Sequence, residues 1–183
     1  MKVEELEGKY VGLYFSAHRC PPGRDFTSVL STTYKKLLEK GDFEIVFISA
    51  DRDEKSFEEY HHTMPWLAVP FSDEKTRKNL DEKFQVNGIP CLVILDKKRG
   101  VITPKGVEII KEFDFEAYPF TTERLDELRA KEEALRAAQT VESLLRSDER
   151  DFVIGHGGRK VGFLPFFAFV FSSACKSFLG YLF

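Results

Sequence analysis

Blocks of hydrophobic and polar residues alternate over the first 120 residues of the chain. Short, continuous apolar runs of this kind are typical of strands that are buried on both faces of a sheet. They predict strands over residues 10–16, 43–49 and 91–95. A turn-like segment over 96–100 then predicts a hairpin into a fourth strand at 101–103.

The segments between these runs carry apolar residues three and four positions apart, which predicts helices. The helices are expected over residues 21–40, 54–64 and 73–84, the last beginning behind Ser72. Because a strand, a helix and a strand follow one another, the first two strands are expected to be parallel. The pattern thus predicts an α/β fold with a small mixed sheet flanked by helices. The apolar face of the first helix is expected to hold Phe26, Val29, Leu30, Tyr34 and Leu37.

Beyond residue 120 the composition changes twice. Residues 121–151 hold 15 charged side chains in 31 positions, and a stripe of leucines predicts one long helix over 121–147. The pattern over residues 148–161 predicts a strand, a Gly-rich turn and the start of another strand. Residues 162–183 form an apolar tail in which Lys176 is the one charged residue.

Composition and charge narrow the classes of protein that remain. With 43% hydrophobic and 31% charged residues, the 183-residue chain can bury a core. The formal net charge of −3 gives no general attraction to nucleic acid or anionic lipid, so no nucleic-acid partner is expected. Three scattered cysteines suit neither a disulfide scaffold nor a zinc site, and no metal is expected. The start of the chain lacks a signal-peptide pattern, so an intracellular location is expected.

Cys20 stands between the first predicted strand and the helix that follows it. At a helix N-terminus, unpaired backbone N–H groups and the helix dipole favour a thiolate. Prolines are compatible with this position because the first helical residues need no internal N–H donor. Cys20 is therefore a candidate nucleophile, and the alternative is a half-buried thiol that acts only as a small hydrophobe. The residues expected to shape the site are Arg19, Pro21, Pro22, Gly23 and Arg24.

Ile89 and Pro90 directly precede the third predicted strand. Proline cannot donate to a central ladder, so it belongs at the first residue of a strand. A cis peptide bond before Pro90 would suit a tight entry into that strand.

Taken together, these features resemble the thioredoxin superfamily and, within it, the tryparedoxin and nucleoredoxin branch. The resemblance implies a thioredoxin-like fold over residues 1–120 and protein-disulfide reductase activity on protein disulfide or thiol substrates. It also implies that no cofactor is bound, that glutathione or a separate reductase donates electrons, and that the protein is cytoplasmic, nuclear or both. The matching segments are residues 12–18, 20–22, 24, 64–71, 88–90 and 117–120.

Two departures from the family pattern bear on the activity. The family's site reads Trp-Cys-Pro-Pro-Cys, whereas this chain has Arg19 in place of the tryptophan and Gly23 in place of the second cysteine. In the dithiol mechanism the second thiol resolves the mixed disulfide that the first has formed. Without it, resolution needs an outside thiol or another cysteine. Cys91 is the candidate alternative resolving thiol, although a core position on a buried strand is the favoured interpretation.

The substrate groove is expected to include Ile89 and Pro90. Trp66 is a candidate wall of that groove, and the alternative is a partly buried aromatic plug. Two functions therefore stay open at this stage: a monothiol protein-disulfide reductase that acts through Cys20, and a redox-degenerate thioredoxin-fold binding module without turnover.

The end of the chain resembles an interrupted repeat of the same design. Residues 148–161 are similar to the opening of another nucleoredoxin module, which predicts a second, incomplete module. Val161–Phe183 approaches the ~20 apolar residues that cross a bilayer, but Pro165, Lys176 and three serines weaken that interpretation. A truncated or aberrant end is favoured over a tail anchor in contact with a membrane.

Overall fold

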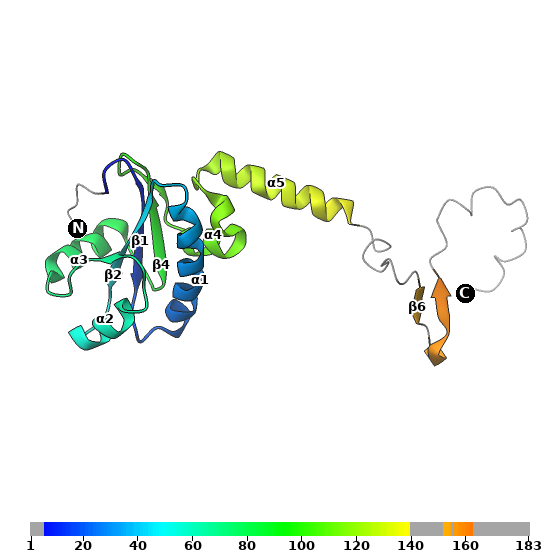
Figure 1. Ribbon diagram of the computed structural model, residues 1–183, viewed down its shortest axis with the longest axis horizontal. Helices are drawn as coiled ribbons and strands as arrows, with labels where there is room; N and C mark the ends of the chain where they lie inside the picture. Colours follow the sequence, from blue (N-terminus) through cyan, green and yellow to red (C-terminus); the bar gives the residue numbers. More distant parts are fainter. Residues whose placement is uncertain (1–5, 140–151, 155, 163–183) are drawn as a thin grey trace, which may run out of the picture. The chain divides into compact units, whose positions relative to one another are not determined.

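The computed structural model describes residues 6–139, 152–154 and 156–162. They divide between two units, Met1–Ala130 and Lys131–Phe183. The first unit holds a five-stranded sheet in the order β3-β2-β1-β4-β5 (Figure 1). The second holds a two-stranded sheet, β6-β7.

The strand β1 (Tyr10–Ser16) lies at the centre of the larger sheet. It pairs in parallel with β2 (Phe43–Ser49) and antiparallel with β4 (Cys91–Leu95). Beyond these, β3 (Leu67–Ala68) pairs in parallel with β2, and β5 (Val101–Thr103) pairs antiparallel with β4. The predicted mixed sheet and its parallel first pair are confirmed.

Helices flank the sheet, and Figure 1 shows α1 and α4 on one side of it and α3 on the other. The last helix, α5, follows a short 3₁₀ turn, η2. The helical elements of this part of the chain are α1 (Pro21–Leu38), α2 (Glu54–His61), α3 (Glu74–Phe84), α4 (Gly106–Phe113), η2 (Asp114–Ala117) and α5 (Thr122–Ala138).

Several details of the predicted helices were wrong. The helix α1 ends at Leu38, before residue 40. The helix α2 ends at His61, before residue 64. Asp73, and not Ser72, caps α3, because its carboxylate accepts the Thr76 N–H at 3.1 Å. On α1, Val29 is 44% exposed although Phe26, Leu30, Tyr34 and Leu37 are buried, so the buried face is narrower than its apolar face.

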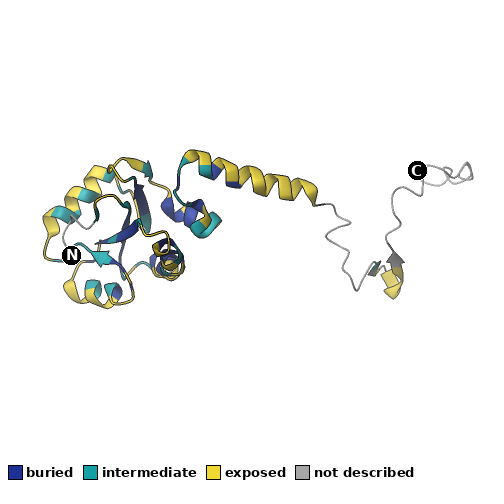
Figure 2. Cartoon of the chain, turned by 45° about the horizontal axis from the view of Figure 1, so that its top comes forward, coloured by how far each residue is buried: buried dark blue, intermediate teal, exposed yellow. Residues whose placement is uncertain are grey.

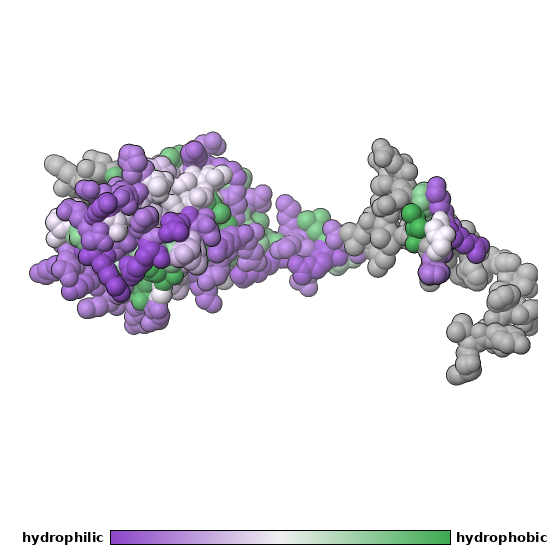
Figure 3. All heavy atoms as spheres, turned by 90° about the horizontal axis from the view of Figure 1, so that it is seen from below, coloured by the Kyte–Doolittle hydropathy of each residue, from purple (hydrophilic) through white to green (hydrophobic). Residues whose placement is uncertain are grey.

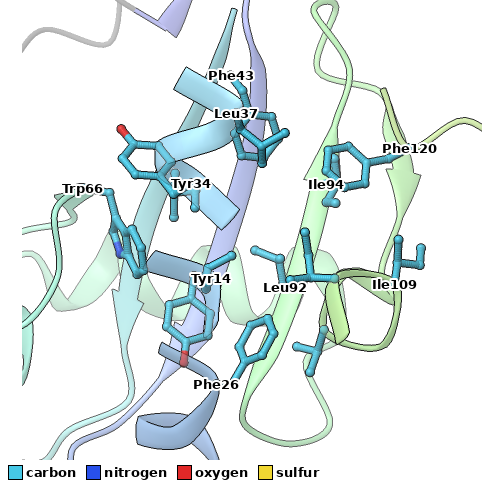
Figure 4. Close-up of a cluster of buried hydrophobic side chains, with 14 of the residues drawn as sticks. Tyr14, Phe26, Tyr34, Leu37, Phe43, Trp66, Leu92, Ile94, Ile109 and Phe120 are labelled. Carbon is cyan, nitrogen blue, oxygen red and sulfur yellow. The ribbon is translucent and has the colours of Figure 1, made fainter. Parts of the chain in front are cut away.

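The core consists of two clusters, one on each face of the sheet. Successive residues of a strand point to opposite faces, so Tyr14 enters one cluster and Phe15 the other. The Tyr14 cluster joins the sheet to α1 and α4, and it includes Phe26 and Leu92 (Figure 4). The Phe15 cluster includes Leu80 of α3. Both faces of the central strands are thereby buried, which is why their sequences are continuous apolar runs.

The helix α5 is shorter than the predicted 121–147. Leu125 and Leu128 are buried, but Leu135 is 59% exposed, and Figure 2 shows the later turns exposed all round. Gln139 is not helical, and residues 140–147 lie outside the described residues. Among the described residues, no helix combines the length and apolar character that a membrane crossing requires.

Beyond α5, the described residues of the second unit form a hairpin. β6 (Phe152–Ile154) pairs antiparallel with β7 (Lys160–Gly162), and the turn between them contains η3 (His156–Gly158). Gly157 and Gly158 both have a φ of 77°, which favours glycine. A strand, a Gly-rich turn and a second strand are therefore present, while the assignment of 148–161 to a second module stays a prediction. Residues 163–183 of the predicted tail lie outside the described residues.

Candidate functional site

Cys20 caps the N-terminus of α1, as the sequence predicts. Its backbone N–H donates to the Ala17 carbonyl at 3.0 Å, which closes the turn after β1, and its own carbonyl accepts the Arg24 N–H at 3.0 Å. Pro21 and Pro22 form the first helical positions. The half-buried thiol donates to the carbonyl oxygen of Ile89, 3.6 Å away.

That contact brings the thiol to the loop that enters β4. The Ile89–Pro90 peptide bond is cis, and β4 begins at the next residue. Two of the motifs found in the sequence, separated by 69 positions, therefore meet at one place.

Arg19 and Arg24 hold the loop that precedes the thiol. Arg19 Nη1 donates to the Ala50 carbonyl at 2.6 Å, and Arg24 Nη1 donates to the His18 carbonyl at 2.6 Å. Both side chains leave guanidinium N–H groups free to face solvent, since each has five donors. Two guanidinium groups from the residues that flank the Cys-Pro-Pro-Gly segment are thus held by backbone carbonyls.

Asp51 is a part of the site that the sequence analysis did not identify. Its carboxylate, which is buried behind β2, accepts the His18 N–H at 2.9 Å and the Ser49 hydroxyl at 2.9 Å. The Arg19 guanidinium lies 3.9 Å from the same carboxylate. An acidic residue directly after a buried strand was the signal available in the sequence.

Gly23 is buried beside the thiol, above a group of buried hydroxyls. Its carbonyl accepts hydrogen bonds from Tyr14 at 3.0 Å and from Thr27 at 2.9 Å. The Thr27 hydroxyl lies 2.7 Å from that of Tyr60, which lies 3.1 Å from Ser16 Oγ. Sequence reasoning missed this group because polar residues inside apolar runs carry no local signal of their partners.

Trp66 does not line a groove. Its ring is 5% exposed and packs edge-on against Tyr14 and Tyr34, with centroid distances of 6.1 and 5.6 Å (Figure 4). Trp66 lies in the core cluster that packs against α1. Its position therefore fits the alternative interpretation, an aromatic plug, and not a groove wall.

Cys91 begins β4 and packs in the cluster of Phe15. Burial raises the pKa of the Cys91 thiol, and the carboxylates of Glu108 and Asp81 raise it further. A thiol with a raised pKa has a smaller thiolate fraction at neutral pH, which does not favour a resolving role. Cys175 lies outside the described residues.

An open groove of about 630 Å³ adjoins the site. Its floor includes Phe15, Ile48 and Ile89, and its walls are the loop after β2 and the first turns of α3. The face of the first unit seen in Figure 3 is mostly hydrophilic. Within the residues that the structure describes, no three His, Cys, Asp or Glu side chains gather so that they could hold a metal ion.

The fold and the site together define a class of protein. A cysteine at the start of the helix after the central strand, next to a cis-proline that enters an antiparallel strand, is the arrangement of a thioredoxin-like fold. A family model described as thioredoxin-like matches residues 8–102. The chain belongs to this family, in its nucleoredoxin and tryparedoxin branch.

The relatives include nucleoredoxins from plants and animals. Probable nucleoredoxin 1 of Arabidopsis thaliana is 48% identical over 161 residues, and nucleoredoxin of Xenopus laevis is 50% identical over 125 residues. These alignments cover 88% and 67% of this chain. The chain spans only 28% and 30% of the length of these two relatives.

Solved structures of tryparedoxins share the fold. Native tryparedoxin I from Crithidia fasciculata is 40% identical, with a TM-score of 0.61, and the match covers 65% of this chain and 84% of that one. Tryparedoxin II complexed with glutathionylspermidine is also 40% identical, with a TM-score of 0.62, and the match covers 66% and 83% of the two chains.

Proposed function

We propose that the chain is a thiol–disulfide oxidoreductase of the protein-disulfide reductase class that acts through Cys20 as a single thiol. The observation that carries the proposal is the position of this half-buried thiol at the N-terminus of α1, 3.6 Å from the Ile89 carbonyl. Membership of the nucleoredoxin and tryparedoxin branch supports the reaction class.

The reaction would proceed by two thiol–disulfide exchanges. The Cys20 thiolate attacks one sulfur of a substrate disulfide, a new S–S bond forms, and the other sulfur leaves as a thiolate that takes a proton from water. Because position 23 is glycine, an outside thiolate then attacks the mixed disulfide and releases Cys20. With glutathione as that thiol, a second molecule frees the substrate, so that two glutathiones are oxidised for each disulfide reduced.

The groove beside Ile89 supports a peptide as the substrate. It is open, it is lined from the loop after β2 to α3, and its floor is apolar. A backbone carbonyl at Ile89 is available to an extended chain once the Cys20 hydrogen has left. We therefore assign protein disulfides as the substrate class, in a reducing compartment such as the cytoplasm or nucleus.

A binding module without turnover is the second candidate, and Gly23 favours it because it removes the resolving thiol. The two are separated by glutathione-dependent reduction of a disulfide-linked fluorogenic peptide, with the full chain carrying Cys91→Ser and Cys175→Ser. Turnover that disappears with Cys20→Ser supports the reductase. Turnover equal to that of Cys20→Ser, in a folded chain that still binds the peptide, would establish the binding module.

Intact-mass measurement adds a direct view of the monothiol step. Stopping the reaction with acid should trap a glutathione or peptide adduct on Cys20. Gly23→Cys should instead produce an internal disulfide and lower the dependence on glutathione, provided that the Ser16 side chain rotates away. Failure of Gly23→Cys to reduce the peptide with any thiol donor would mean that the scaffold itself is incompetent.

A further inference from the structure

The space beside the Cys20 thiol is filled by a hydroxyl from another element. A Cβ on Gly23 would lie 3.4 Å from Cys20 Sγ, and it would collide with Oγ of Ser16. Ser16 is the last residue of β1 and is fully buried. Its hydroxyl therefore occupies the volume next to the thiol that a side chain at position 23 would take.

Ser16 belongs to the buried hydroxyl group described above. Tyr14 donates to the Gly23 carbonyl at 3.0 Å, and burial raises the pKa of Tyr14, which keeps this hydroxyl protonated and able to donate. Thr27 can donate either to the same carbonyl or to the Tyr60 hydroxyl, 2.7 Å away. The hydrogens still to be assigned are those of Ser16, Thr27 and Tyr60.

These three hydrogens allow two arrangements. While Cys20 is a thiol and donates to Ile89, Ser16 can donate to the Tyr60 hydroxyl, 3.1 Å away, while Tyr60 donates to Thr27 and Thr27 to the Gly23 carbonyl. When Cys20 loses its proton, Thr27 can donate to Tyr60 and Tyr60 to Ser16 Oγ, which frees the Ser16 hydrogen for the thiolate. Hydrogen bonds to an ionised acceptor are about twice as strong as neutral ones, so a thiolate favours the second arrangement.

We propose that Ser16 stabilises the Cys20 thiolate through this hydrogen bond, in the space that Gly23 leaves open. The proposal rests on Cys20 being the nucleophile of the proposed function. The same bond would also favour Cys20 as the leaving group when an outside thiol attacks the mixed disulfide, because a stabilised thiolate leaves faster.

The test measures how the rate of Cys20 alkylation by iodoacetamide depends on pH, in the full chain with Cys91→Ser and Cys175→Ser. Ser16→Ala should move the midpoint about one pH unit higher and slow alkylation below the midpoint by about tenfold. Ser16→Thr, which keeps a hydroxyl, should recover most of the shift. The matched control is Thr33→Val, which removes a buried hydroxyl of α1 roughly 18 Å along the helix from its first residue, Pro21.

Tyr60→Phe provides a second route to the same result if Ser16→Ala does not fold. It removes the partner that donates to Ser16, so a smaller shift in the same direction is expected. Midpoints for Ser16→Ala or Tyr60→Phe equal to that of Thr33→Val would overturn the proposal, even in a chain that reduces disulfides. A parent chain that reduces no disulfide, although Ser16→Ala shows the expected midpoint shift, would instead contradict the reductase function and retain the role of Ser16.

Discussion

Phe15 and Cys91 lie directly opposite each other on the antiparallel strands β1 and β4. Both belong to the core cluster on the α3 side of the sheet, whereas the following residue of β4, Leu92, belongs to the cluster beneath α1. Because side chains alternate along a strand, the Cys91 thiol is directed to the α3 side. The Cys91 thiol is thus directed to the face of the sheet opposite the one that α1 covers.

Replacing Cys91 by serine should leave glutathione-dependent turnover within about twofold of the parent chain, because an outside thiol resolves the mixed disulfide. The comparison uses chains that both carry Cys175→Ser. Cys20→Ser in the same background is the negative control. A tenfold or larger loss on Cys91→Ser, with unchanged thermal stability, would instead identify Cys91 as the resolving thiol.

Gly106 marks the close approach of α4 to β4. A Cβ there would lie 2.6 Å from the Leu92 carbonyl oxygen and 2.8 Å from its Cγ, and a backbone atom cannot rotate away. Gly106→Ala should lower the free energy of unfolding by about 2 kcal/mol in urea titrations. Gly88→Ala is the matched control, because nothing lies within 4 Å of its Cβ position, and it should change stability by less than about 0.5 kcal/mol. Equal losses for the two variants would contradict the packing argument.

Arg19 should influence which reagents reach Cys20. Arg19 directly precedes Cys20 in the sequence, its guanidinium donates to the Ala50 carbonyl, and its side chain is half exposed. With Cys20 as the sole cysteine, Arg19→Gln should lower the ratio of alkylation rates for anionic iodoacetate over neutral iodoacetamide by about twofold to fivefold. Added salt should shrink the difference. Arg129→Gln, on the exposed side of α5, should leave the ratio unchanged, and an unchanged ratio for Arg19→Gln would refute the electrostatic effect.

The elements that the sequence predicted well are those with a strong local pattern. β1, β2 and β4 are buried on both faces, so each is a continuous apolar run with clear ends. The strand β3 was not predicted, because it has only two residues and lies at the edge of the sheet, where no continuous apolar run is needed. α4 was missed because its N-cap, Lys105, makes no side-chain capping bond and its apolar face covers little more than two turns.

The residues of the candidate site likewise fall into those that a local sequence pattern marks and those that it does not. Cys20 and the Ile89–Pro90 pair were found because each sits at a boundary between elements that the local sequence marks. Ser16 and Tyr60 are 44 positions apart and meet only through the packing of α2 on the sheet. A hydrogen bond between residues so far apart leaves no periodicity or motif in the sequence, so it could not be predicted from one sequence.

The pH dependence of stability should report on Asp42, the residue directly before β2. Burial alone would raise the pKa of this carboxyl, but hydrogen bonds from Lys97 and Tyr118, each at 2.5 Å, outweigh it and hold the pKa below its usual range. A carboxyl whose pKa is lower in the folded than in the unfolded state stabilises the fold above pH ~4, and this contribution is lost as pH falls through the folded pKa. Asp42→Asn should therefore cost about 1 kcal/mol at pH 7 in urea titrations, a value reduced by partial exposure, and the gap should close below about pH 3. Asp126→Asn, on exposed α5, should cost less than about 0.5 kcal/mol at either pH, and an Asp42→Asn gap that persists in acid would show that lost packing, rather than charge, causes the effect.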